Sequence, residues 1–249
     1  MRTILQPFYT AWVLVTFIAC LLAAFPVFFI IALFNSVWAR RTIWRVIRYW
    51  SIGWLWLIGM PVRVLGNRPP GDKYVIVANH ISYLDTLVIF PAIRFYFRAL
   101  GKYEMSRVPI LGFIYKQVVI LVKRDNPHNR ARSMRLMWRV LHRESSIIVF
   151  PEGTFNEGNT PLKDFYDGAF RLAINAQTPI LPILFPDTPD RWHYSAWWKL
   201  WPGKNRAVYL DPINTTGLEA GDLPALKEKV YKIMEAELVR LGYNTCSAI

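Results

Sequence analysis

Cysteine is scarce in this sequence of 249 residues, which contains only Cys20 and Cys246. A disulfide framework or a cysteine-based metal site would need several cysteines at characteristic spacings, so we expect neither. Acidic residues are also few, since 17 Asp and Glu stand against 30 Lys and Arg and leave a formal net charge of +13. This excess of positive charge predicts an anionic partner.

Charge is absent altogether between Thr3 and Ala39. Within that segment, residues 8–34 form an apolar run that is long enough, as a helix, to cross a hydrocarbon layer of about 30 Å. The run is not followed by a small-residue cleavage site and a polar mature start, so we do not interpret it as a removable signal peptide. It predicts a membrane element that stays attached to the chain.

The residues that follow the apolar run are typical of the lipid headgroup level, because arginines alternate there with aromatic side chains. The arginines are Arg40, Arg41, Arg45 and Arg48. A second apolar stretch, from Ile52 to Val62, is too short to span a bilayer comfortably. Because Pro26 is able to kink the first helix, two geometries remain open: one true crossing, or a two-helix element that dips into a single leaflet.

The position of the arginines favours a cell-membrane location with the rest of the chain on the cytoplasmic side. An anionic bilayer explains the net charge more simply than nucleic acid does, so we expect the bilayer and no nucleic acid as a partner. We expect membrane-anchoring helices in residues 1–63 and a separate domain in residues 64–249.

The second of these domains alternates short apolar runs with longer helical segments, which predicts an α/β fold. We expect a mixed central sheet flanked by helices. Candidate strands lie at residues 74–79, 117–122, 146–150, 180–185 and 206–210.

Helical periodicity is clearest in two segments. Residues 127–144 predict a basic amphipathic helix whose charged face is either solvated or binds phosphates. Residues 223–241 predict a closing helix. The first helix should place Arg132, Arg135, Arg139 and Arg143 opposite Met134, Met137, Trp138 and Leu141, and the second should pack Leu226, Val230, Ile233, Met234 and Leu238.

A histidine and an aspartate follow the first candidate strand, in residues 79–85. Ser82 is a candidate N-cap for a helix that begins near Tyr83. In a regular helix, five residues would rotate His80 about 140° away from Asp85, so the two meet only if His80 lies in a turn. His80 would then be a general base that Asp85 orients. The alternative is a capping box formed by Ser82 and Asp85, without catalysis.

Three further segments accompany residues 79–85. They are residues 101–112 with the cations that follow the next strand, the sequence Pro151-Glu152-Gly153-Thr154, and residues 178–183. In order and spacing the four segments resemble the four motif blocks of the glycerolipid acyltransferase family, which includes the lysophosphatidate (1-acyl-sn-glycerol-3-phosphate) acyltransferases. The resemblance covers roughly residues 75–185.

The resemblance implies transfer of a fatty acyl group from a coenzyme A or acyl carrier protein thioester to a glycerolipid hydroxyl. His80 would be the base and Asp85 its support, with no cofactor and no metal. A developing oxyanion needs hydrogen-bond donors, and backbone N–H groups at the turn or near Gly153 are candidates. The candidate substrate-binding residues are Asn79, Ser82, Lys102, Arg124, Glu152, Gly153 and Thr154.

Two positions depart from the family pattern for binding phosphate. Phe155 stands where the family usually has Arg, and Asp167 stands where it usually has Lys. Lys163 and Arg171 are candidate substitutes. We therefore expect a lysophospholipid acceptor, with lysophosphatidate giving phosphatidate as the first choice. Another lysolipid, an amino-acid lipid, a transacylase or thioesterase reaction, and an inactive lipid-binding protein are the alternatives.

One further cluster is rich in tryptophan and lies outside these motifs. It contains Trp192, Trp197, Trp198 and Trp201, with Arg191 and Lys199 nearby. Tryptophan mixed with cations is typical of membrane interfaces, so this segment is predicted to be an interfacial loop.

Overall fold

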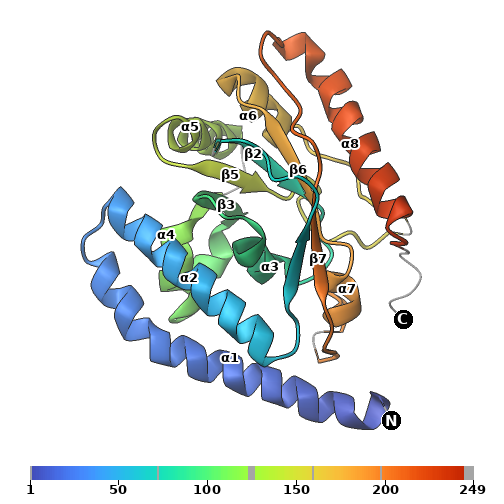
Figure 1. Cartoon of the computed structure of the whole chain (residues 1–249). Coiled ribbons are helices and arrows are strands. Elements are labelled where there is room, and N and C mark those ends of the chain that lie inside the picture. The colour runs from blue at the N-terminus through green and yellow to red at the C-terminus, as the bar shows by residue number, and fades with distance from the viewer. Residues whose placement is uncertain (1, 72, 123–126, 159, 197, 244–249) are drawn as a thin grey trace.

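A computed structural model describes residues 2–71, 73–122, 127–158, 160–196 and 198–243. Its centre is a seven-stranded sheet in the order β1-β7-β6-β2-β5-β3-β4 (Figure 1). The strand pairings are parallel except that of β6 with β7, which is antiparallel. The predicted mixed central sheet flanked by helices is therefore confirmed.

The five predicted strands are all present, with ends that differ by no more than about two residues from the prediction. Strands β1 and β3 were not predicted, because Arg63 and Arg98 interrupt their short apolar runs. The strands are β1 (Val62–Leu65), β2 (Val75–Ala78), β3 (Phe97–Lys102), β4 (Val119–Val122), β5 (Ser146–Val149), β6 (Ile180–Leu184) and β7 (Asn205–Tyr209).

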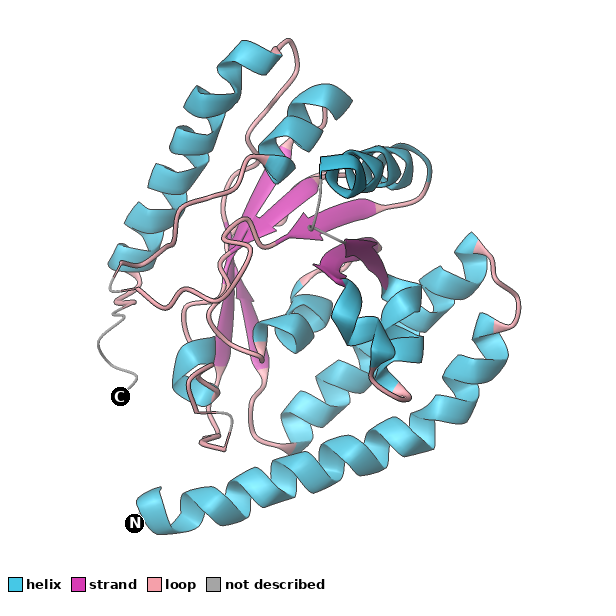
Figure 2. Cartoon of the chain, turned by 180° about the vertical axis from the view of Figure 1, so that it is seen from behind, coloured by secondary structure: helices cyan, strands magenta, loops and turns pink. Residues whose placement is uncertain are grey.

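Helices cover both faces of the sheet (Figures 1 and 2). Side chains alternate between the faces of a strand, so Ile76 and Ala78 of β2 pack toward α1–α4, whereas Val75 and Val77 pack toward α5, α6 and α8. The helices are α1 (Arg2–Ala32), α2 (Val37–Leu57), α3 (Asp85–Ala92), α4 (Leu111–Val118), α5 (Pro127–Arg143), α6 (Gly168–Ala176), α7 (Thr188–Arg191) and α8 (Leu223–Arg240), with short 3-10 turns at Tyr103–Arg107 and Ala220–Asp222.

The N-terminal element consists of two helices that pack against each other. Ser36 caps α2 by accepting a hydrogen bond from the Ala39 N–H at 3.1 Å. The ring of Phe17 on α1 contacts Trp50 and Trp54 on α2, with centroids 5.6 and 5.3 Å apart. The predicted second apolar stretch is not a unit of its own, because α2 joins most of it to the preceding arginines in one helix. The boundary predicted between residues 63 and 64 falls inside β1.

Helix α1 is long and apolar enough, from Ile4 to Ala32, to cross a membrane. It runs along the side of the α/β domain, and both of its ends are attached there (Figure 2). Near its start, Thr10 Oγ1 donates to the Trp198 carbonyl at 2.8 Å, and near its end Phe29 contacts Phe113 of α4 at 5.7 Å. Its opposite side is an exposed apolar stripe, formed by Ile4, Phe8, Val15, Ile18, Leu22 and Ile30.

Two predictions about helix faces were wrong by one residue. Trp138 of α5 and Ile233 of α8 were predicted on packed faces, yet both side chains are exposed. Each is adjacent in sequence to a buried residue, Met137 or Met234, and one residue rotates the side chain by about 100° around the helix. The four arginines of α5 are exposed as predicted.

Candidate active site

The turn after β2 brings His80 and Asp85 together. His80 Nδ1 lies 3.0 Å from Asp85 Oδ2, and the exposed fractions of the two side chains are 15% and 0%. His80 comes two residues after the end of β2, and α3 begins only at Asp85. The contact is therefore made across a turn, as the five-residue spacing between His80 and Asp85 requires.

Asp85 also organises the turn itself. Its Oδ2 accepts hydrogen bonds from the N–H groups of Ile81 and Ser82, both at 2.9 Å, and its Oδ1 accepts one from Thr188 Oγ1 at 2.5 Å. Because Oδ2 is an acceptor, the Nδ1 of His80 carries the proton, and Nε2 is left as the basic nitrogen. Thr188 was not predicted, since nothing local links it to a residue 103 positions earlier.

The predicted N-cap at Ser82 is wrong. Helix α3 starts at Asp85, and Ser82 Oγ instead accepts from the Leu84 N–H at 3.0 Å and donates to the Trp192 carbonyl. The physical reason is that the Asp85 carboxylate takes the N–H groups of the turn, so the chain becomes helical later. The bond from the Ser82 N–H to Asp85 is half of a capping box, and it coexists with the histidine contact.

Glu152 supports the same turn from the loop after β5. Its Oε1 accepts from the His80 N–H at 2.8 Å and its Oε2 from the Lys163 N–H at 2.9 Å, and the residue is only 1% exposed. Gly153 follows with φ of +75°, a left-handed conformation that favours glycine. Both oxygens of Glu152 are thus occupied by backbone groups, which gives this carboxylate a positioning role at His80.

This geometry is accompanied by clear similarity to known proteins. Residues 61–185 match the sequence profile of the family described as Acyltransferase, which is half of the chain. The chain belongs to the acyltransferase family. It is 30% identical over 190 residues to "1-acyl-sn-glycerol-3-phosphate acyltransferase alpha" of Mus musculus, covering 75% of this chain and 66% of the relative.

Two further acyltransferases extend the comparison to plants and bacteria. "1-acyl-sn-glycerol-3-phosphate acyltransferase" of Limnanthes alba is 29% identical over 163 residues, covering 65% of this chain and 57% of the relative. "1-acyl-sn-glycerol-3-phosphate acyltransferase" of Haemophilus influenzae is 26% identical over 189 residues, covering 74% of this chain and 77% of the relative. This chain therefore spans less than two thirds of the plant relative and about two thirds of the mammalian one.

The fold is also that of a solved acyltransferase. The 1-acyl-sn-glycerophosphate (LPA) acyltransferase PlsC from Thermotoga maritima superposes with a TM-score of 0.78 at 22% identity, covering 97% of this chain and 98% of that one. At this identity the likeness establishes the fold, including the two N-terminal helices as part of it.

The remaining predicted site residues of this acyltransferase lie at one edge of the sheet. Asn79 is buried, and its amide exchanges two hydrogen bonds with the Phe185 backbone, which joins the ends of β2 and β6. Lys102 is exposed at the end of β3, and Thr154 is exposed beside Glu152. Their contact with substrate stays a prediction, and Arg124 lies outside the described residues.

The two departures from the family pattern have different surroundings. The Phe155 ring lies 4.5 Å from the His80 ring, directly beside the base. Asp167 instead pairs with Lys227 of α8 at 2.7 Å. Of the two candidate substitutes, Lys163 donates to Thr154 Oγ1 at 2.9 Å, close to the Glu152 turn, whereas Arg171 is exposed on α6.

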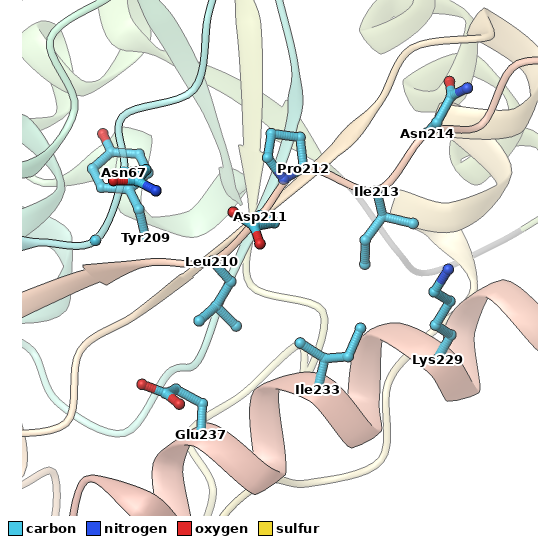
Figure 3. A pocket seen from close by; sticks show the side chains of 11 residues that line it. Asn67, Tyr209, Leu210, Asp211, Pro212, Ile213, Asn214, Lys229, Ile233 and Glu237 are labelled. Atoms are coloured by element: carbon cyan, nitrogen blue, oxygen red, sulfur yellow. The ribbon is translucent and has the colours of Figure 1, made fainter.

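A pocket of about 520 Å³ lies elsewhere in this acyltransferase, between α8 and the segment after β7 (Figure 3). Leu210, Ile213 and Ile233 line it together with Asp211 and Glu237. Because β7 is antiparallel to β6, its carboxyl end lies at the opposite edge of the sheet from His80. The pocket is therefore separate from the catalytic candidates.

The burial of Glu152 predicts a pH effect on stability. Burial raises the pKa of Glu152 to about 7, although hydrogen bonds from the Lys163 and His80 N–H groups act in the opposite direction. A raised pKa in the folded state gives stability that is complete below the unfolded value and is lost as pH rises through 7. Glu152→Gln does not titrate, so relative to wild type it should gain on the order of 3 kcal/mol between about pH 5 and pH 8.5.

Thermal unfolding of both proteins across this pH range measures that difference. Glu157→Gln, which replaces an exposed glutamate in the same loop, is the matched control. A constant difference between Glu152→Gln and wild type would show that Glu152 does not change its protonation in this range.

Proposed function

We propose that this protein transfers a fatty acyl group from a coenzyme A or acyl carrier protein thioester to the hydroxyl of a lysophospholipid, with lysophosphatidate as the first acceptor. The observation that carries the proposal is the 3.0 Å contact between His80 Nδ1 and the buried Asp85 carboxylate. The names of the relatives, 1-acyl-sn-glycerol-3-phosphate acyltransferases, support this choice of acceptor.

In the proposed mechanism, His80 Nε2 takes the proton of the acceptor hydroxyl as its oxygen attacks the thioester carbonyl. The Asp85 carboxylate balances the positive charge that then resides on the imidazole ring. Collapse of the tetrahedral intermediate forms the ester, breaks the carbon–sulfur bond and returns the proton to the leaving thiolate. This sequence of steps needs a base and a carboxylate and calls for no metal or cofactor.

The hydrogen bonds of the turn limit which backbone N–H groups are able to stabilise the oxyanion. The N–H groups of His80, Ile81 and Ser82 already donate to the carboxylates of Glu152 and Asp85. The turn amides, which were candidate donors, are therefore engaged in holding the base. The Gly153 N–H likewise donates to the Phe150 carbonyl at 3.1 Å, so it is engaged as well.

The charged side chains near His80 indicate which headgroup the acceptor lipid carries. Lys163, on Thr154, and Lys102, at the end of β3, are cations at the same edge of the sheet, and they support an acceptor that carries phosphate. Phe155 favours a second candidate, because an apolar ring beside His80 suits a lysolipid or amino-acid lipid without a phosphate monoester at that position.

The experiment that tests the function incubates the purified full-length protein with labelled acyl-CoA or acyl carrier protein and a panel of lysolipids. We expect lysophosphatidate to be converted to phosphatidate, detected by mass spectrometry. Release of free fatty acid alone would indicate a thioesterase. If no acceptor supports turnover with either donor, acyl transfer is excluded.

We also propose that α1 lies in one leaflet of the cell membrane, with the catalytic domain on the cytoplasmic side. Both ends of α1 are attached to the domain, at Thr10 and at Phe29, so a perpendicular crossing would pull charged parts of the domain into the hydrocarbon layer. The exposed apolar stripe of α1 is the surface that would enter the lipid.

Three exposed aromatic residues test the membrane proposal: Phe8 and Trp12 near the start of α1, and Trp198 in the tryptophan-rich segment that Thr10 contacts. Changing all three to Ser should weaken flotation with anionic vesicles at least about tenfold, because each aromatic ring contributes apolar burial at the interface. Tyr166→Ser removes an equally exposed ring from a distant loop and should leave binding unchanged. Equal flotation of the triple variant and wild type would exclude this surface. Trp192 and Trp201 are half-buried, and Trp197 lies outside the described residues.

A further inference from the structure

The imidazole ring of His80 lies between two phenylalanine rings. Phe150 stacks on it nearly parallel, with centroids 4.1 Å apart and an interplanar angle of 17°. Phe155 contacts it at 4.5 Å and 53°. Phe150 directly follows β5, and Phe155 follows the Glu152-Gly153 turn, so the two rings reach His80 from one loop.

Phe155 is itself held by two further aromatic side chains. Tyr83, from the turn after β2, meets it edge-on at 5.0 Å and 80°. Tyr194, from the segment after α7, stacks on it at 5.7 Å and 24°. Rings from two parts of the chain therefore fix Phe155, and through it one side of His80.

We infer that Phe150 and Phe155 form a clamp that fixes the plane of the His80 ring and stabilises its protonated form during acyl transfer. The inference rests on the proposed function, because it assigns a positioning role in that reaction. Neither phenylalanine is a proton donor or acceptor, so both act through His80.

The hydrogen bond from Nδ1 to Asp85 alone leaves the imidazole free to swivel about that contact. Two ring contacts restrict this rotation and thereby fix the direction of Nε2. Aligning the base in advance matters because a proton is transferred efficiently only over hydrogen-bond distances. The clamp thereby supplies orientation that Asp85 does not provide.

The second role of the clamp is electrostatic. The faces of an aromatic ring carry partial negative charge and attract a cation within about 6 Å of the centroid. When His80 accepts the proton, its positive charge therefore lies against the face of Phe150, with the tilted ring of Phe155 beside it. A cationic side chain in place of Phe155 would instead put like charge next to the protonated base.

The other ionisable groups around His80 come from several elements. Asp85 contacts its Nδ1, Glu152 accepts from its backbone N–H, and the amino group of Lys163 lies on Thr154. Tyr83 and Tyr194 contact Phe155 and not His80. The hydrogen bonds of Asp85, Glu152 and Lys163 do not involve the phenylalanine rings, so shortening a ring removes none of these partners.

Phe150→Leu and Phe155→Leu test the clamp, because leucine keeps the apolar volume and removes the ring. The His80 ring can be titrated by NMR in detergent with labelled histidine, the signal being assigned by its loss in His80→Ala. In each variant the titration midpoint should fall by about half a pH unit, as expected for loss of one cation–π contact. The acid limb of the pH–rate profile should move equally, and kcat should fall about tenfold with KM unchanged.

Phe155→Tyr and Phe155→Trp retain an aromatic face and should restore both the midpoint and kcat. Phe165→Leu, which removes a buried ring stacked on Phe170, is the matched control and should leave the midpoint unchanged. If both clamp variants titrate as wild type, the rings only fill space. If the midpoints fall but wild type transfers no acyl group, the clamp stands and the proposed function fails.

Discussion

His80→Ala should lower the rate of acyl transfer by about 10²–10⁴-fold while the protein still folds, since this is the usual contribution of a general base. His80 is the residue whose Nε2 can take the hydroxyl proton, and its Nδ1 is already committed to Asp85. Its side chain is largely buried, but the main-chain hydrogen bonds of the turn involve its N–H and carbonyl and survive the substitution. Activity should therefore be lost much more than stability.

The measurement is kcat and KM for acyl transfer, together with the thermal unfolding midpoint of the same preparation. His142→Ala is the matched control, because His142 is an exposed histidine on α5 that contacts Trp138 and lies on the far face of the sheet. It should retain wild-type kcat. A His80→Ala protein with more than about a tenth of wild-type kcat would mean that another group is the base.

The contact between His80 and Asp85 could be predicted from sequence because its geometry is local. A strand that ends at Ala78 fixes where the turn begins, and five residues is a distance over which only a few backbone paths exist. The residues that contact this pair could not be predicted, because they are distant from it in the sequence. Thr188 comes from beyond β6, and a contact over 103 residues leaves no periodic signal in one sequence.

The difference between local and long-range contacts also explains which of the other sequence predictions were right. The strands β2, β5 and β6 were predicted because they are continuous apolar runs, whereas Arg63 and Arg98 interrupt the short apolar runs of β1 and β3. The Ser82 N-cap was predicted from a local preference that the Asp85 carboxylate overrides. The contact of Phe155 with His80 could not be predicted either, because the two residues are 75 positions apart and meet only in the folded chain.

Glu144→Ala should destabilise the protein by about 3 kcal/mol, the lower end of the cost of breaking a buried ion pair, because the two cations left without their partner are partly exposed. Glu144 follows α5, and its carboxylate is only 8% exposed. It accepts two hydrogen bonds from the Arg40 guanidinium, both at 3.0 Å, and one from Tyr96 Oη at 2.9 Å. Arg98 Nη1 of β3 is 3.8 Å away. One carboxylate thus ties α2 of the membrane element to the sheet.

The pH dependence of this contribution has a defined sign. Burial acts to raise the pKa of Glu144, but the hydrogen bond from Arg40, the charge of Arg98 and the hydrogen bond from Tyr96 outweigh it and hold the pKa below the ordinary value. A lowered pKa in the folded state gives stability that is present above the unfolded value and is lost as pH falls through the folded one. The network should therefore be intact at neutral pH and fail only in acid.

Urea unfolding of the full chain in detergent at pH 7, followed by tryptophan fluorescence, measures the loss. Glu228→Ala is the matched control, because Glu228 pairs with Lys232 on the exposed side of α8, where such a pair contributes about 0–1 kcal/mol. Glu144→Gln keeps the shape and some hydrogen bonding, so it should fall between the two. A loss below about 1 kcal/mol in Glu144→Ala would mean that water replaces the carboxylate at Arg40 and Arg98. The attachment of α2 to the sheet would then depend little on this carboxylate.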